Sequence, residues 1–227
     1  MRKIEKLEEI QILLEEGEID KAIPIYNQLF EKYSKDAELH VTIIGLLGDE
    51  LILANIGWKS LSEIIRICDL AIDNLPSDDL LFFYLRKLYV YLFYLENKKD
   101  WYDNEEFVLS YIKELQEKYP KEKEIYKKKG DLETYLDLEE EALVDYNKAI
   151  KLSGKYEEEL YMKRDMLLMR LGRTQEIIHE YELMLKDIDT HDGLLLKKIY
   201  SNLINLYDGV GNKDKVIYYK NLLNDLQ

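Results

Sequence analysis

Six stretches of the 227-residue sequence repeat the same pattern of packing residues. In each stretch, a small or aliphatic residue is followed four positions later by a second packing residue, and three positions after that by a third. The first residues of the six stretches are Ala22, Ile64, Val108, Ala142, Ile177 and Val216. Spacings of four and three place side chains on one face of an α-helix. The pattern therefore predicts six amphipathic helices, separated by 34 to 44 residues.

The other two positions of the pattern are filled in a similar way along the chain. The second positions are Tyr26, Cys68, Ile112, Tyr146, Tyr181 and Lys220, and the third are Leu29, Ala71, Leu115, Ala149, Met184 and Leu223. Lys220 is charged where the other repeats have a packing residue, as we expect where the outer side of a terminal repeat meets water. Because one helix pair cannot bury its apolar face alone, the repeats are predicted to stack around one continuous core.

The scarcity of turn-forming residues favours long helices. The chain has only 10 glycines and 3 prolines, well below average usage. The packing pattern, together with the positions of these glycines and prolines, predicts twelve helices. They lie at about 2–16, 20–34, 36–55, 59–74, 78–97, 104–119, 121–136, 139–152, 155–171, 174–188, 192–208 and 213–226.

Residues 126–154 carry the fullest version of the repeat. They place Tyr126 and Gly130 in a first helix, and Ala142, Tyr146 and Ala149 in a second. These residues resemble the tetratricopeptide repeat, a pair of antiparallel helices of about 34 residues. The resemblance implies an all-α fold, a right-handed α-solenoid of about six antiparallel helix pairs. It covers one domain, 1–227, with repeats at about 2–34, 36–76, 78–120, 121–154, 155–189 and 192–227.

Glycines fall in the predicted turns inside the helix pairs. Gly17, Gly172 and Gly211 each follow a first helix, where a left-handed backbone conformation favours glycine. In the first of these turns, Asp20 is predicted to cap the following helix. The segment 208–215, DGVGNKDK, lacks the spacing of a phosphate-binding loop, so we interpret it as another such turn.

Charge and reactive residues disfavour several classes of function. The formal net charge of −14 argues against nucleic acid as a ligand, because phosphates require a basic surface. Cys68, the single cysteine, cannot form an internal disulfide and is predicted to be a buried, inert thiol. His40, His179 and His191 have no partners at the spacing of a metal site or a catalytic base. We therefore expect no enzyme activity, no metal and no cofactor.

The most apolar segment runs from Leu80 to Leu95. It is 16 residues long and is interrupted by Arg86 and Lys87, whereas a membrane span needs about 20 mostly apolar residues. Its four tyrosines, Tyr84, Tyr89, Tyr91 and Tyr94, surround one helix, which predicts burial of that helix on several sides with partners for the hydroxyl groups. Alternatively, some of them line an aromatic groove. The N-terminal residues lack the apolar core of a secretory signal. We expect a cytoplasmic protein that does not bind membranes.

In the tetratricopeptide repeat family, ligands usually lie against the first helices, on the concave side of the stack. By this resemblance, the groove of the last three repeats would be lined by Lys127, Asp131, Met162, Met166, Met169, Arg170, Lys198, Ser201 and Asn205. The three methionines are spaced four and three, so they form one helical stripe. Two interpretations of the stripe stay open, core packing and an adaptable apolar groove floor.

The family's clamp for a chain-terminal carboxylate is not reproduced as a set. Lys127 and Asn205 match it in residue type, but Asp131 and Met166 replace the expected asparagine and polar residue. Capture of a terminal carboxylate is therefore not expected at this groove.

The expected function is a non-catalytic protein–protein interaction module, a monomer or weak homo-oligomer, that binds a peptide or a folded partner in its concave groove. The alternative is an acidic inhibitor or immunity protein that masks a basic toxin or effector. Residues 1–50 and 101–150 each carry a charge of −6. That excess fits a solvated surface as well as an acidic face that attracts a basic partner. Under both hypotheses the partner is a protein or peptide.

Overall fold

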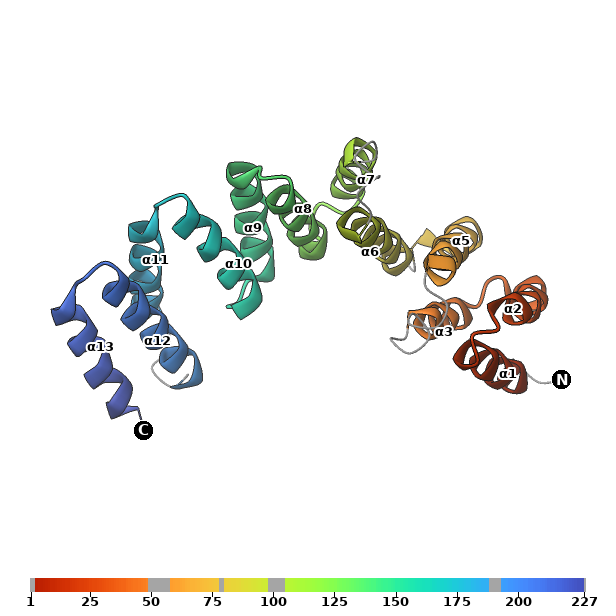
Figure 1. Cartoon of the computed structure of the whole chain (residues 1–227), viewed down its shortest axis with the longest axis horizontal. Coiled ribbons are helices and arrows are strands. Elements are labelled where there is room, and N and C mark those ends of the chain that lie inside the picture. Colours follow the sequence, from red (N-terminus) through yellow and green to blue (C-terminus); the bar gives the residue numbers. More distant parts are fainter. Residues whose placement is uncertain (1–2, 49–57, 78–79, 98–104, 188–192, 227) are drawn as a thin grey trace. The chain divides into compact units, whose positions relative to one another are not determined.

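The computed structural model describes residues 3–48, 58–77, 80–97, 105–187 and 193–226, and within these ranges the chain forms α-helices and no β-strand (Figure 1). The chain divides into two compact units, Met1–Ile125 and Tyr126–Gln227, and each has its own interior. The all-α prediction is confirmed.

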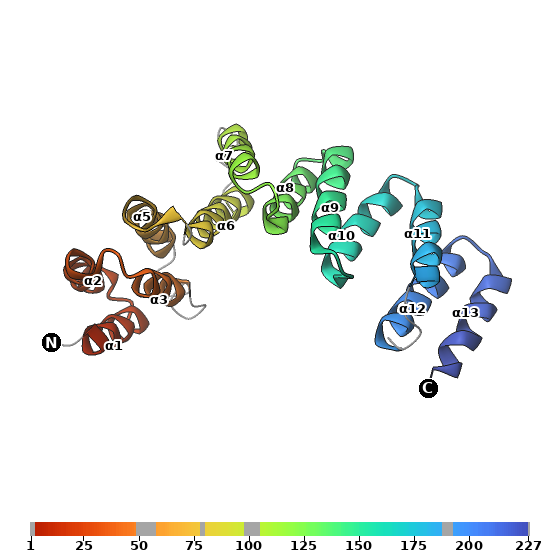
Figure 2. The same cartoon turned by 180° about the vertical axis from the view of Figure 1, so that it is seen from behind.

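The first unit contains six helices among its described residues. They are α1 (Lys3–Glu15), α2 (Ile19–Tyr33), α3 (Ala37–Leu47), α5 (Trp58–Asn74), α6 (Leu81–Asn97) and α7 (Glu105–Lys118). Within this unit α1 packs against α2 and α3, α3 packs against α5, and α6 packs against both α5 and α7 (Figure 2). Neighbours along the chain are therefore neighbours in space, as in stacked helix pairs.

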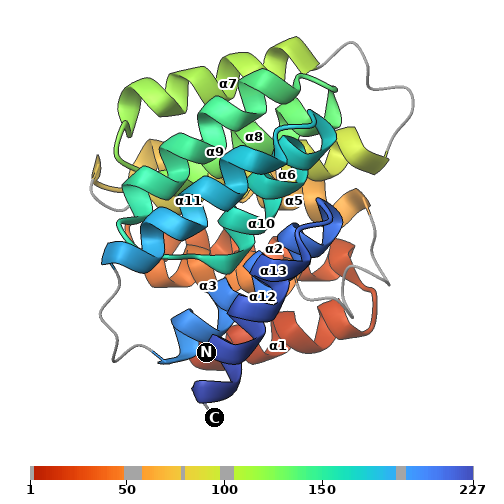
Figure 3. The same cartoon turned by 90° about the vertical axis from the view of Figure 1, so that its left-hand side faces the viewer.

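The second unit holds the remaining helices of the described chain. They are α8 (Lys123–Tyr135), whose first turn belongs to the first unit, α9 (Glu139–Ser153), α10 (Glu158–Arg170), α11 (Thr174–Asp187), α12 (Gly193–Gly209) and α13 (Lys213–Asp225). Helix α10 packs against α9 and α11, and α12 packs against α11 and α13 (Figure 3). The one-domain organisation over 1–227 stays a prediction.

The predicted helices agree with the observed ones, and the largest difference among described residues lies at the start of α10. We expected this helix to begin at residue 155, but it begins at Glu158. Gly154 ends α9 in a left-handed conformation with φ of 66°. The Ser153 hydroxyl donates to the Glu157 carboxylate at 2.5 Å and lies 3.2 Å from the Lys155 carbonyl oxygen, so its contacts span the connection between the two helices. The second half of the predicted helix 36–55 lies outside the described residues.

The repeated packing pattern is buried as predicted. All six first positions, from Ala22 to Val216, lie in the interior, and Lys220 is exposed at the last repeat. Gly130 shows why one repeat needs a residue without a side chain, since a Cβ there would lie 2.9 Å from Cε1 of Tyr146. This glycine lets α8 and α9 approach closely at their crossing.

The turns inside four of the helix pairs share one backbone geometry. Gly17, Gly172 and Gly211 have φ of 77°, 71° and 76°, and Asp137 takes the equivalent position with φ of 58°. In each turn, the next residue donates its N–H to a carbonyl oxygen five residues earlier, a bond that closes the end of a helix. The prediction for Asp20 is wrong, because it lies in the first turn of α2 and Glu18 is the capping residue. The Asp20 carboxylate instead pairs with Lys59 at 2.6 Å.

Two reactive residues of the first unit are part of its interior. The Cys68 thiol is buried, as predicted, and burial raises its pKa to about 12. His40 is also buried, and its Nε2 donates to the Ser34 carbonyl oxygen at 3.0 Å. Its Nδ1 then accepts from the Tyr26 hydroxyl at 3.0 Å. Both residues are therefore part of the packed interior of this unit.

Helix α6 is partly buried and partly exposed. Phe83, Leu88 and Val90 of this helix are buried, whereas Tyr89 is exposed, so at least one of the four tyrosines lies on a side that faces solvent. The side chain of Tyr94 lies outside the described residues. Among the helices that the structure describes, none has the length and apolar character needed to cross a membrane.

Candidate protein-interaction site

A cavity of about 480 Å³ opens in the second unit between α10, α11 and α12. Methionines of α10 line one side, and Asn205, Leu206 and Val210 of α12 line another. Thr174 and Tyr181 contribute from α11. Its size is in the range of pockets that take small ligands or several side chains of a partner. We call this space the methionine cavity.

The methionine stripe faces this cavity and solvent. Met162, Met166 and Met169 keep 54%, 54% and 46% of their surface exposed. The opposite side of α10 supplies the interior, with Leu160 and Leu167 buried. The core-packing interpretation of the stripe is therefore wrong, because the core is already filled from the other face of the same helix.

Charged and polar groups form the inner wall of the cavity. Arg164 is 1% exposed, and its Nε and Nη2 donate to Oδ1 of Asp165 at 3.0 and 2.6 Å, while Nη1 donates to Glu180 at 2.5 Å. The Tyr181 hydroxyl donates to Oδ2 of Asp165 at 2.6 Å. The amide nitrogen of Asn202 donates to the Tyr181 oxygen at 3.2 Å. Asp165, Tyr181 and Asn202 all line the cavity, so these bonds link it to a buried arginine.

Burial shifts the pKa values of the ionisable groups in and behind this wall. It raises the pKa of the Asp165 carboxyl, which the adjacent Arg164 guanidinium opposes. It also raises the pKa of Tyr181, and the Asp165 carboxylate adds to that rise. Burial disfavours the charge on Arg164, but Asp165 and Glu180 outweigh it and raise the pKa of the guanidinium. At neutral pH Tyr181 therefore keeps its proton and Arg164 keeps its charge.

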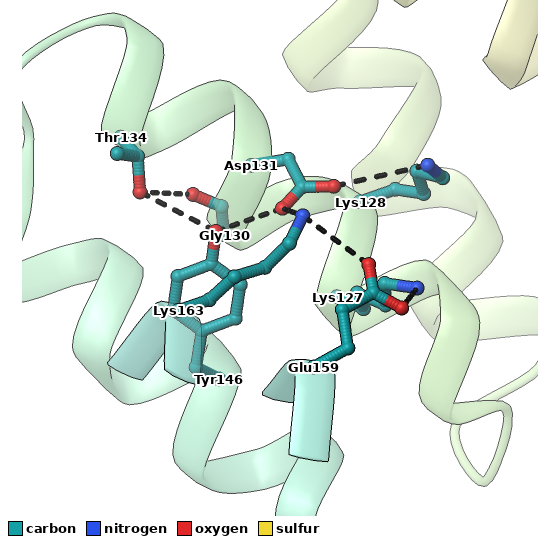
Figure 4. A network of polar contacts seen from close by, with 8 residues as sticks. All are labelled: Lys127, Lys128, Gly130, Asp131, Thr134, Tyr146, Glu159 and Lys163. Atoms are coloured by element: carbon teal, nitrogen blue, oxygen red, sulfur yellow. Dashed lines mark hydrogen bonds and ion pairs between the residues drawn. The ribbon is translucent and has the colours of Figure 1, made fainter. Parts of the chain in front are cut away.

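Lys127 and Asp131 lie in an ion-pair network between the first helices α8 and α10 (Figure 4). Lys127 pairs with Glu159 at 2.8 Å, and this bond holds the pKa of the Glu159 carboxyl below its usual range. Asp131 accepts from the Tyr146 hydroxyl at 2.8 Å and from Lys163 at 2.5 Å. These two predicted site residues join adjacent repeats and do not line the methionine cavity.

Some of the other predicted site residues line the methionine cavity, and the rest form ion pairs or hydrogen bonds outside it. Asn205 lines the cavity together with the three methionines. Arg170 pairs with Glu139 and, at 3.5 Å, with Asp137, and Lys198 pairs with Glu158 at the cavity rim. The Ser201 hydroxyl donates to the backbone oxygen of Lys197 at 2.8 Å. The structure thus brings together four of the nine predicted residues, the methionines and Asn205.

Sequence reasoning missed the polar wall of the cavity. Tyr181 was identified only as a packing residue, and Asp165 and Asn202 were not singled out. One signal was present in the sequence, because the charged pair Arg164–Asp165 interrupts a helix side that otherwise carries Leu160, Tyr161, Leu167 and Leu168. A buried charge needs a partner, so a polar neighbour of this pair was foreseeable, although its identity was not.

A second buried cluster lies between α8 and α9. Lys129 pairs with Glu133 at 2.6 Å and also with Asp145. Burial raises the pKa of Glu133 to about 7, and its Oε2 has no hydrogen-bond partner among the described residues. Across the part of the chain that the structure describes, no group of three or more His, Cys, Asp or Glu side chains could hold a metal ion.

Comparison with solved structures identifies the fold of this chain. No protein-family model matches the sequence, and no curated protein matches it. Among solved structures, a tetratricopeptide repeat protein from Parabacteroides merdae aligns with 98% of this chain and 79% of its own, at 15% identity and a TM-score of 0.51. MamA aligns with 93% of this chain and 90% of its own at 16% identity, with a TM-score of 0.36 that adds no support. The chain therefore has the fold of a tetratricopeptide repeat protein.

Proposed function

We propose that this protein is a non-catalytic protein-interaction module that binds a segment of a partner protein in the methionine cavity. Its fold is one of stacked helix pairs, which present extended surfaces to partners. Exposure of three methionines on one stripe, beside a cavity of about 480 Å³, is the observation that carries the proposal.

The chemistry of the cavity fits apolar side chains of a partner. Methionine side chains are flexible and polarizable, so they adapt to differently shaped occupants. Leu206 and Val210 extend the apolar surface on α12, with Val210 exposed. An apolar surface that is open to water in the free protein gains stability when a partner covers it.

The charge of the chain indicates which partners to expect. A net charge of −14 disfavours nucleic acid and favours a protein segment that is neutral or basic outside its apolar anchor. We place such a protein in the cytoplasm, as a monomer or weak homo-oligomer. No observation on the described residues singles out a toxin or effector, so the inhibitor alternative has no specific support.

A peptide-display selection tests the proposal directly. Random peptides are selected on the wild-type protein, and the enriched peptides are measured against Met166→Glu by calorimetry. Met166 is exposed, so the substitution should leave the unfolding free energy within about 0.5 kcal/mol. Binding should fall at least tenfold, because docking would leave the new charge unpaired in an apolar contact.

The matched control is Val144→Glu. Val144 lies on α9, keeps 69% of its surface exposed and does not line the cavity, so the same charge should leave peptide binding unchanged. Equal binding of the peptides to the wild type and to both variants would contradict the proposed site.

A further inference from the structure

The hydrogen bonds of the cavity wall fix the orientation of the Asn202 amide. Asp165 is held as a carboxylate by two bonds from Arg164, so it only accepts hydrogen bonds. The Tyr181 hydroxyl has one proton, which it donates to Asp165 at 2.6 Å. Its oxygen can then only accept from Asn202, whose Nδ2 lies 3.2 Å away. The carbonyl oxygen Oδ1 is therefore the end of the Asn202 amide that this bond does not use, and Asn202 lines the cavity.

Tyr156 is a further tyrosine of the cavity wall. Its side chain lines the cavity and packs on Tyr161, with 4.7 Å between ring centroids. Burial raises the pKa of Tyr156. Two tyrosine rings, Tyr156 and Tyr181, therefore line the cavity together with Asn202.

The charges of the cavity argue for an occupant that donates hydrogen bonds and carries no negative charge. Glu158 and Asp165 are the charged residues among the described residues that line it, and both are carboxylates. Their positive partners, Lys198 and Arg164, do not line the cavity. An anionic side chain would meet two carboxylates whose cationic partners, Lys198 and Arg164, are already engaged in ion pairs.

The methionines favour an aromatic ring over an aliphatic chain. Thioether sulfur makes favourable contacts with aromatic rings, most often at the ring edge. Three such side chains flank the opening within one helical stripe. Of the aromatic residues, tryptophan carries the largest ring and a single N–H that only donates.

We propose that the methionine cavity selects the indole ring of a tryptophan on the partner segment, with Oδ1 of Asn202 accepting the indole N–H. This inference rests on the proposed function, because it names the side chain that anchors the partner. Asn202 then acts as the residue that sets specificity, while the methionines supply the contact area.

Titration with indole and 1-methylindole, followed by the methionine methyl NMR signals, tests this inference. The chain has five methionines, so the spectrum is simple to assign by substitution. Indole should shift the methyl signals of Met162, Met166 and Met169 through its ring current. 1-Methylindole has the same ring without the N–H, and it should bind about three- to tenfold more weakly, the value of one hydrogen bond.

Asn202→Leu separates the donor preference from the cavity itself. In this variant indole and 1-methylindole should bind equally, while the control Asn147→Leu, at an exposed position of α9, should keep the wild-type preference. Thermal melts establish that both variants fold.

Each outcome bears on one of the two proposals. Equal binding of the two probes to the wild type would overturn the role of Asn202 and leave the apolar cavity standing. A preference that persists in Asn202→Leu would also overturn that role. If neither probe shifts a methionine methyl signal but a display-selected peptide does, the tryptophan inference fails and the proposed function stands. If the peptide also leaves these signals unchanged, both proposals fail.

Discussion

Replacement of Arg164 by methionine should destabilise the protein more than any surface substitution. Arg164 is almost fully buried and makes two hydrogen bonds to Asp165 and one to Glu180. Glu180 is partly exposed, so water replaces its lost partner at little cost. Asp165 is buried and would keep only the bond from Tyr181. Removal of one partner from a buried ion pair costs about 3–5 kcal/mol, and the exposure of Glu180 places this case at about 3–4 kcal/mol.

Differential scanning calorimetry measures the loss. In a chain of this length, 1 kcal/mol lowers Tm by roughly 2–4 °C, so Arg164→Met should lower it by about 6–16 °C. The deficit should shrink at low pH. Burial raises the folded-state pKa of Asp165 above its unfolded value, so protonation relieves the unpaired charge as the pH falls through that folded-state pKa.

The double variant Arg164→Met/Asp165→Asn is the matched control. It removes the unpaired charge and keeps an acceptor for the Tyr181 hydroxyl, so it should recover at least about 1 kcal/mol relative to Arg164→Met. A change in Tm below 2 °C for the single variant would refute the reasoning, as would additive losses in the double variant.

Three further predictions concern the second unit. Gly130→Ala should lower the unfolding free energy by about 1–3 kcal/mol in a denaturant titration, because its Cβ would overlap the Tyr146 ring, and an unchanged midpoint would contradict the close crossing. Asp137→Gly should raise the unfolding free energy by about 0.5 kcal/mol, since φ is 58° there, and a loss of stability would argue against backbone strain. Glu133 has a raised pKa of about 7, so its contribution to stability should fall as the pH rises from about 4.5 to 7. Glu133→Gln should remove this part of the pH dependence, at most about 3 kcal/mol, and an unaltered pH profile would refute the assignment.

The repeated packing faces were predictable because local spacing determines them. Residues four and three apart share a helix face whatever the rest of the fold does, so the spacing alone places Ala142, Tyr146 and Ala149 in the interior. The glycine turns were equally local. Asp137 was not predicted in such a turn, because it takes a conformation that is usually left to glycine.

The functional surface was less predictable because it depends on partners from other helices. Family resemblance placed Lys127 and Asp131 in the groove, but both lie in ion pairs with residues of α10 about 32 positions along the chain. Spacing within one helix carries no information about such long side-chain contacts. The methionine stripe was recognised, yet its exposure depends on the opposite face of α10, which fills the core.

The central claim is that a partner segment binds in the methionine cavity, and the methionine methyl NMR spectrum with a display-selected peptide tests it most directly. The account predicts that the signals of Met162, Met166 and Met169 shift in proportion to occupancy, while the signal of Met184, which packs against the interior, stays in place. A peptide that binds with unchanged signals from all three stripe methionines would contradict the claim.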